Sequence, residues 1–246
     1  MCMLHFRHSD SSVRYRSRPV KDGPEARMLE MFMSQYEKRL KGDGGDYAIF
    51  YEPQMPTGYP DCVIVKFDAS AYDGWSKSAV PLSDVDMRIL HVLVLSRGLT
   101  AGTLARKSGF GLGVINKALE NLRGRGFVEA RGSRWVAAPR RRCLGIRNIL
   151  SIEAKMSDCS GVLDQAVLNK TFANSSCVLM PTRRPSHETL SVAKDSGLGI
   201  YLQPEQGHAE QVLKPDSCGG MRASYAIWRF NEWIGRRLAK NRRNTR

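Results

Sequence analysis

The stretch from Ile149 to Met156 constrains the fold of this chain most strongly, because apolar and polar residues alternate along it. Side chains of a β-strand point alternately to opposite faces of the sheet. The alternation therefore predicts a strand that faces a core with Leu150, Ile152, Ala154 and Met156. Ser151, Glu153 and Lys155 then share the opposite face, where a carboxylate stands beside an ammonium group.

Glu153 and Lys155 are the kinds of side chain that metal-assisted hydrolysis of a phosphodiester requires. A carboxylate binds a hard divalent cation, and a neighbouring amine positions the attacking water and helps to deprotonate it. A Glu-x-Lys triplet also arises by chance about once in a chain of this size. The alternative interpretation is a strand with a solvated ion pair, so the triplet needs a second motif before it predicts a site.

The composition describes a globular protein with a polyanionic partner. The chain has 246 residues, of which 42% are hydrophobic and 25% charged, and it carries a net charge of +14. Such a charge favours DNA, because neutralised phosphates release counterions. No apolar run reaches the length of a membrane span and no signal peptide is evident, so we expect a cytoplasmic protein without membrane contact. The six cysteines include no Cys-x-x-Cys pair, which argues against a zinc ribbon.

The predicted secondary structure changes in character twice along the chain. Helical spacing over residues 25–40 and apolar runs at 47–52 and 61–67 predict a helix and two strands. The strand at Glu153 is followed by alternating predicted helices (159–172, 186–195) and strands (176–180, 199–202, 209–213). Between these parts, from Pro81 to Ala138, the pattern is helix, helix, turn, helix and hairpin.

The middle part resembles the winged-helix DNA-binding domains of bacterial regulators. Ser83 and Thr100 are placed to cap the first two helices, and nine basic residues stand against four acidic ones. If the third helix enters the major groove, we expect phosphates or base edges to contact Asn116, Lys117, Arg123, Arg131, Arg134, Arg140, Arg141 and Arg142. One departure is that Gly109, Gly111 and Gly113 crowd the start of that helix. Protein binding is the alternative role of such a domain.

A second motif lies upstream of Glu153, where Gly58-Tyr59-Pro60-Asp61 leads into the apolar run Cys62 to Val65. With Pro60-Asp61 as first element and Glu153-Ala154-Lys155 as second, the chain resembles the PD-(D/E)xK nuclease superfamily. The resemblance implies that Asp61 and Glu153 hold a metal while Lys155 attends the water. It also implies that Glu25, from the opening helix, joins the catalytic and metal-binding set. The helix after the second motif would contribute Gln165.

The interval between Asp61 and Glu153 is long for this family, and an inserted winged helix accounts for it. We therefore expect an α/β fold with a restriction-endonuclease-like mixed central sheet flanked by helices, interrupted by a winged helix-turn-helix insertion. The expected domains are a flexible basic arm (1–22), a nuclease-like core in two parts (23–78 and 140–215), the inserted winged helix (79–139), and a basic C-terminal helix and tail (216–246).

These observations predict a DNA endonuclease that depends on Mg²⁺, or Mn²⁺ in its place, and has DNA as its partner. The family resemblance also implies a homodimer that cuts both strands. Two alternatives remain open at this stage. The core could be a catalytically inactive scaffold in a DNA-binding regulator, or the chain could be a subunit of a larger restriction or transposition assembly that cleaves only with protein partners.

Overall fold

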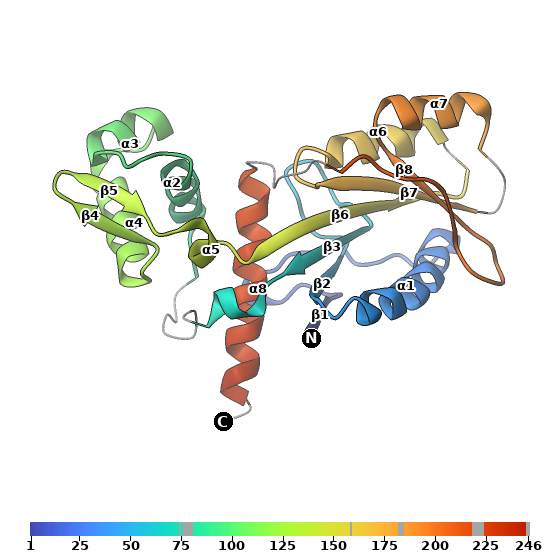
Figure 1. Ribbon diagram of the computed structural model, residues 1–246, viewed down its shortest axis with the longest axis horizontal. Coiled ribbons are helices and arrows are strands. Elements are labelled where there is room, and N and C mark those ends of the chain that lie inside the picture. The colour runs from blue at the N-terminus through green and yellow to red at the C-terminus, as the bar shows by residue number, and fades with distance from the viewer. Residues whose placement is uncertain (74, 76–80, 158, 182–184, 218–223, 245–246) are drawn as a thin grey trace. The chain divides into compact units, whose positions relative to one another are not determined.

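The computed structural model describes residues 1–73, 75, 81–157, 159–181, 185–217 and 224–244. The chain divides into two compact units, each built from two separate segments. Residues Met1–Phe67 and Arg147–Arg222 form the larger, which we call the sheet unit. Residues Asp68–Ile146 and Ala223–Arg246 form the smaller, which we call the winged unit. The predicted mixed α/β architecture, a large sheet flanked by helices, is confirmed (Figure 1).

In the described residues, one seven-stranded sheet runs in the order β1-β2-β3-β6-β7-β8-β9. Its strands are β1 (Met3–Phe6), β2 (Asp46–Tyr51), β3 (Cys62–Phe67), β6 (Ile146–Ala154), β7 (Ser175–Pro181), β8 (Gly199–Gln203) and β9 (Glu210–Leu213). β6, β7 and β8 pair in parallel, whereas β2 pairs with β3, and β8 with β9, in antiparallel fashion. Sequence-distant β3 and β6 are therefore neighbours in the middle of the sheet.

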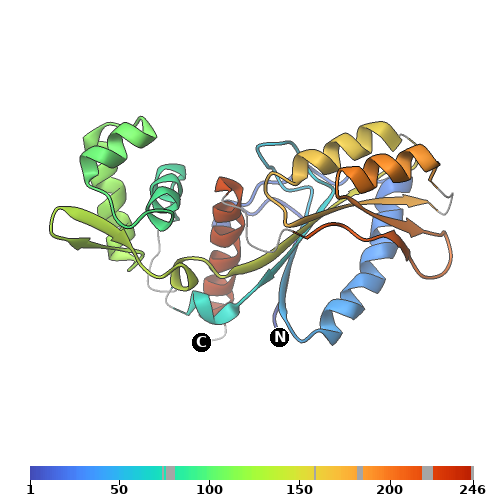
Figure 2. The same cartoon turned by 45° about the horizontal axis from the view of Figure 1, so that its top comes forward.

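Helices cover both faces of this sheet, as the two views in Figures 1 and 2 show. α1 (Pro24–Gly42) packs on one face, where its Leu29 and Phe32 share a cluster with Leu150 and Ile152 of β6. α6 (Cys159–Asn169) and α7 (His187–Asp195) cover the other face, where their apolar side chains pack against those of β7 and β8. The predicted alternation of β6 is thus correct for Leu150, Ile152 and Ala154. Met156 is exposed instead, because it lies beyond the end of the strand.

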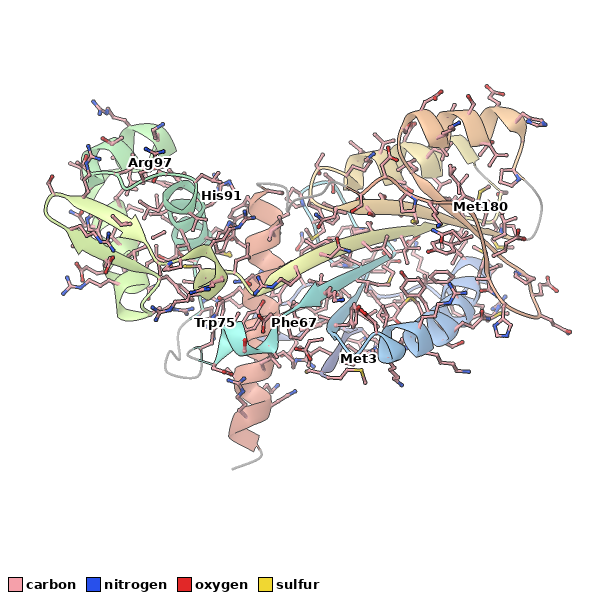
Figure 3. All side chains as sticks on the ribbon, in the orientation of Figure 1. Met3, Phe67, Trp75, His91, Arg97 and Met180 are labelled. Atoms are coloured by element: carbon pink, nitrogen blue, oxygen red, sulfur yellow. The ribbon has the colours of Figure 1, made fainter. Side chains whose placement is uncertain are left out.

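The expectation of a flexible basic arm at residues 1–22 is wrong. Residues Met3–Phe6 form β1, which pairs in parallel with β2, and Met3 packs against the α1 side of the core (Figure 3). Downstream, the buried Tyr15 donates its hydroxyl proton to the carbonyl of Tyr51 at 2.8 Å. Residues 16–18 then hydrogen bond along residues 52–54. The basic side chains are therefore carried on a segment that is fastened to the sheet.

The winged unit contains the predicted helices and hairpin. They are α2 (Asp84–Val94), α3 (Ala101–Ser108), α4 (Leu112–Gly124), β4 (Val128–Arg131) and β5 (Arg134–Ala137). Ser83 accepts from the backbone of Asp86 in a capping box, and Thr100 accepts from the backbone of Thr103, as their positions predicted. Gly98 joins α2 to α3 with a φ of 104°, and a Cβ there would meet Val136 at 2.9 Å. Glycine is therefore required at this turn.

A helix from the end of the chain completes the winged unit. α8 (Tyr225–Asn244) contacts α2 and the short helix η2 (Ala69–Tyr72). Its buried Asn231 accepts from Tyr72 and from the backbone of Gly145, and donates to the carbonyl of Cys143. The nearby α5 (Arg140–Cys143) also belongs to this unit.

The winged unit is thus wider than the expected insertion of residues 79–139, and it includes α8 where a separate C-terminal region was expected. The expected boundary at 78/79, and the tail residues 218–223 and 245–246, lie outside the described residues. None of the helices in the described part of the chain combines the length and the hydrophobicity needed to cross a membrane.

Candidate functional site

Asp61 and Glu153 meet at the point in the sheet where β3 begins and its neighbour β6 ends. The backbone N–H of Ala154 donates to the Asp61 carboxylate at 2.7 Å, across 93 positions of sequence. Asp61 is held from its other side as well, because its carbonyl accepts from the backbone N–H of Glu52 at 3.1 Å. The two acidic residues predicted to act together are therefore brought together by strand pairing.

Their carboxyl groups are close enough for each to shift the pKa of the other. Glu153 is only 4% exposed, and burial, followed by the charge of Asp61, raises its pKa to about 8. Burial also raises the pKa of Asp61, and it outweighs the hydrogen bond from Ala154, which lowers that pKa. Two adjacent buried carboxylates repel each other, so one of them holds a proton unless a cation is supplied.

Asn169 is the side chain that fixes Glu153, and sequence reasoning missed it. It lies on α6, is 3% exposed, and donates from Nδ2 to Glu153 Oε1 at 2.5 Å. The predicted residue of this helix, Gln165, is exposed and lies one turn earlier. An i, i+4 pair shares one face of a helix, so the spacing from Gln165 was a usable signal.

Lys155 and Glu25 form an ion pair beside the two carboxyl groups. Lys155 Nζ lies 3.2 Å from Glu25 Oε1, and the same oxygen accepts from the backbone N–H of Met156 at 3.4 Å. Glu25 is near enough to Asp61 to raise its pKa. The ammonium group is thus held at the end of β6 by the first turn of α1.

A pocket of about 790 Å³ contains all of the predicted catalytic residues. Its lining includes Asp61, Glu153, Lys155, Glu25 and Gln165, which come from β6, α1, α6 and the approach to β3. The three-carboxylate metal set is not assembled, however. Within the described ranges, no three His, Cys, Asp or Glu side chains converge closely enough to hold a metal. Glu25 forms an ion pair with Lys155, so the carboxyl groups of Asp61 and Glu153 form a pair without it.

Glu52 and Arg18 also belong to this pocket, although neither was predicted. Arg18 Nη2 lies 2.5 Å from Glu52 Oε2, and burial, followed by the charge of Asp61, raises the pKa of Glu52. Glu52 has a φ of 48°, in the left-handed region that residues with a side chain seldom adopt. Its backbone bonds to Arg18 and Asp61 hold it there. The N-terminal segment, which was expected to be a flexible arm, thus contributes Arg18 to the pocket that holds Asp61 and Glu153.

The predicted DNA-contacting residues of the winged unit are exposed. On α4 these are Asn116, Lys117 and Arg123; on the hairpin, Arg131 and Arg134; on α5, Arg140, Arg141 and Arg142. The first turn of α4 begins at Gly111 without a side-chain cap and exposes Leu112 and Val114. Asn116 is therefore the first polar side chain of α4 that could contact a groove of DNA.

Arg125 does not belong to this basic surface, although it counts toward the charge of the unit. Its side chain is 5% exposed and its Nη1 lies 3.6 Å from Glu232 on α8. Glu232 also accepts from the backbone of Leu82 and from Arg236, each at 2.7 Å. The Arg125 side chain is therefore part of the contact with α8.

One comparison with known proteins finds a match. The family model of TrmB, described as a sugar-specific transcriptional regulator, matches residues 78–143. The match covers α2 to α5 and the hairpin of the winged unit, without α8 and without any strand of the seven-stranded sheet, and it supports the winged helix-turn-helix assignment. No curated protein and no solved structure matches the chain.

Proposed function

We propose that the protein binds duplex DNA through its winged unit. The match to a family of transcriptional regulators supports this role, as do the exposed basic residues of α4, the hairpin and α5. Lysine and arginine contacts to phosphates would supply affinity, while Asn116 is suited to read an adenine edge.

We further propose that the sheet unit hydrolyses phosphodiester bonds in DNA with the help of a divalent cation. One observation carries this proposal: Asp61, Glu153, Lys155, Glu25 and Gln165, selected from sequence alone, line the same pocket. A chain without this chemistry has no evident need to bury two adjacent carboxyl groups beside an ion-paired lysine.

The residues present fit a magnesium ion of the kind that retains water ligands. Mg²⁺ is commonly bound by one or two carboxylates, with water and substrate phosphate completing its shell. Asp61 and Glu153 would hold it, and the raised pKa values of both groups are the expected mark of a carboxylate pair that lacks a countercharge. When bound, such an ion stabilises the negative charge that develops on the phosphate.

The protein's own groups then have distinct tasks. Asn169 holds Glu153, which lines the pocket, in place through Oε1. Lys155, fixed by Glu25, is placed to orient the attacking water molecule by donating a hydrogen bond to it, and the proton that the water loses passes to a carboxylate of the pocket or to solvent. Burial strengthens the bond between Asn169 and Glu153, because the surrounding dielectric constant is low.

A second candidate function is a DNA-binding regulator without hydrolytic activity. The family match favours it, since the matched family is one of transcriptional regulators. In that case the pocket of the sheet unit would bind an effector, and the carboxyl groups would bind its hydroxyl or cationic groups.

A plasmid-nicking assay separates the two functions. Supercoiled DNA is incubated with Mg²⁺ or Mn²⁺ and with the wild type, Glu153→Gln or Lys155→Met. We expect metal-dependent nicking by the wild type and a loss of at least about a hundredfold in each variant. Glu188→Gln, an exposed carboxylate on α7, is the matched control. Duplex binding without nicking by any of these proteins would favour the regulator.

A further inference from the structure

Five lysine and arginine side chains line the acidic pocket in the described residues, and four of them are paired with carboxylates. The pairs are Arg7–Glu30 (3.6 Å), Arg18–Glu52 (2.5 Å), Arg27–Asp22 (3.5 Å) and Lys155–Glu25 (3.2 Å). Lys21 is exposed and has no carboxylate within 4.0 Å in the described chain. It is therefore the pocket cation that can bind an incoming anion without giving up an existing ion pair.

The same pocket presents an aromatic ring. Tyr59, in the loop between β2 and β3, is 40% exposed, whereas the tyrosines of β2, Tyr47 and Tyr51, are buried. The guanidinium carbon of Arg18 lies 5.5 Å from the centre of the Tyr59 ring. An exposed ring that already holds one flat group is a surface on which a nucleobase can stack, and each such stack contributes about 1–3 kcal/mol.

The depth of the acidic pair restricts the form of nucleic acid that can reach it. Glu153 is almost fully buried, and the pocket walls include the fastened segment at Arg18 and Lys21 and the loop at Gly58 and Tyr59. Base faces in an intact duplex are covered by their neighbours, whereas an unpaired strand is narrow and offers its base faces for stacking.

From these contacts we propose that the pocket binds an unpaired DNA strand, with a base stacked on Tyr59 and a phosphate bound by Lys21. This inference rests on the proposed nuclease function, for which it specifies the substrate: a single-stranded end, gap or overhang.

Binding of a fluorescent oligothymidylate of about ten nucleotides, a length within the usual range for such grooves, tests the proposal by anisotropy. Ca²⁺ replaces Mg²⁺ so that no hydrolysis intervenes. We expect Tyr59→Ala to weaken binding about tenfold and Tyr59→Phe to retain it, because only the ring is required. Lys21→Ala should weaken binding and reduce the salt dependence by about one phosphate contact, a change of roughly 0.7 in the logarithmic slope.

Two controls make the result decisive. Lys38→Ala removes another exposed lysine of the sheet unit, outside the pocket lining, and should leave strand affinity unchanged. A blunt duplex of the same length should bind the Tyr59→Ala variant as it binds the wild type. The proposal is overturned if Tyr59→Ala changes strand affinity by less than twofold, or if it weakens strand and duplex binding equally.

The test stands apart from the nicking assay. Strand binding that depends on Tyr59 and Lys21, without metal-dependent cleavage of either the supercoiled plasmid or a duplex that carries a single-stranded gap, would end the nuclease proposal and keep the binding site. Nicking that proceeds while Tyr59→Ala and Lys21→Ala bind the strand normally would keep the nuclease and end this inference.

Discussion

At the scale of single residues, the carboxyl pair of Asp61 and Glu153 makes the stability of the protein depend on pH. Glu153 has a pKa of about 8 in the folded chain, against an ordinary value of 4.5. Between these values the folded state holds a proton that the unfolded state has released. Stability therefore falls as pH rises through this range.

We expect the metal-free protein to have a lower thermal midpoint at pH 8.5 than at pH 5.5, and Glu153→Gln to remove much of this difference. The substitution should stabilise the protein at pH 8.5 by about 1–3 kcal/mol, because the amide carries no charge to bury. Scanning calorimetry in the presence of a chelator measures the effect. An identical pH dependence in wild type and variant would contradict it, and Glu188→Gln serves again as control.

Sequence could predict the residues of the site whose chemistry is visible in a short motif. Asp61 follows Pro60 at the start of an apolar run, and Glu153 and Lys155 alternate with apolar residues on a strand. Arg18 and Glu52 carry no such signal, because their importance depends on a hydrogen-bonded contact between segments 34 positions apart. The local periodicity of a sequence does not predict tertiary contacts of that kind.

At the scale of elements, α8 depends on a close approach that only glycine permits. A Cβ at Gly235 would meet the ring of Trp75 at 2.3 Å, and both residues belong to the winged unit. Figure 3 marks Trp75 just after the helix η2. The position thus combines a residue of low helix propensity with tight packing against an indole ring.

Gly235→Ala should destabilise the winged unit by about 1–3 kcal/mol, because the ring must move to admit a methyl group. Gly113→Ala is the matched control, since a Cβ at that position in α4 meets nothing within 4 Å. The control should gain about 0.5–1 kcal/mol from its higher helix propensity. Urea unfolding followed by tryptophan fluorescence measures both changes, and equal effects of the two substitutions would refute the packing account.

The elements that sequence predicted best are those with both periodicity and a cap. α2 and α3 begin after Ser83 and Thr100, as expected from their hydroxyl groups. β1 was missed because it has only four residues and lies at the edge of the sheet, where alternation over so short a span is not distinctive. The role of α8 was missed too, since amphipathic spacing predicts a buried face but not its partner.

At the scale of the whole molecule, the net charge of +14 predicts duplex binding that weakens steeply with salt. Lys117→Ala and Arg134→Ala should each reduce the logarithmic salt slope by about 0.9, the value for one lost phosphate contact. Lys38→Ala in the sheet unit should leave the slope unchanged. Affinities measured by fluorescence anisotropy between about 50 and 200 mM salt test this, and unaltered slopes in the first two variants would exclude these residues as phosphate contacts.

The two-segment composition of each unit has a consequence for synthesis on the ribosome. The strands of the sheet unit end at Leu213, whereas α8, which completes the winged unit, begins at Tyr225. During translation the central helices and hairpin emerge long before their last helix does. The central part of the winged unit, which precedes β6 in the chain, therefore stays incomplete, with the surface of α2 that contacts α8 uncovered, until residues 225–244 have left the ribosome.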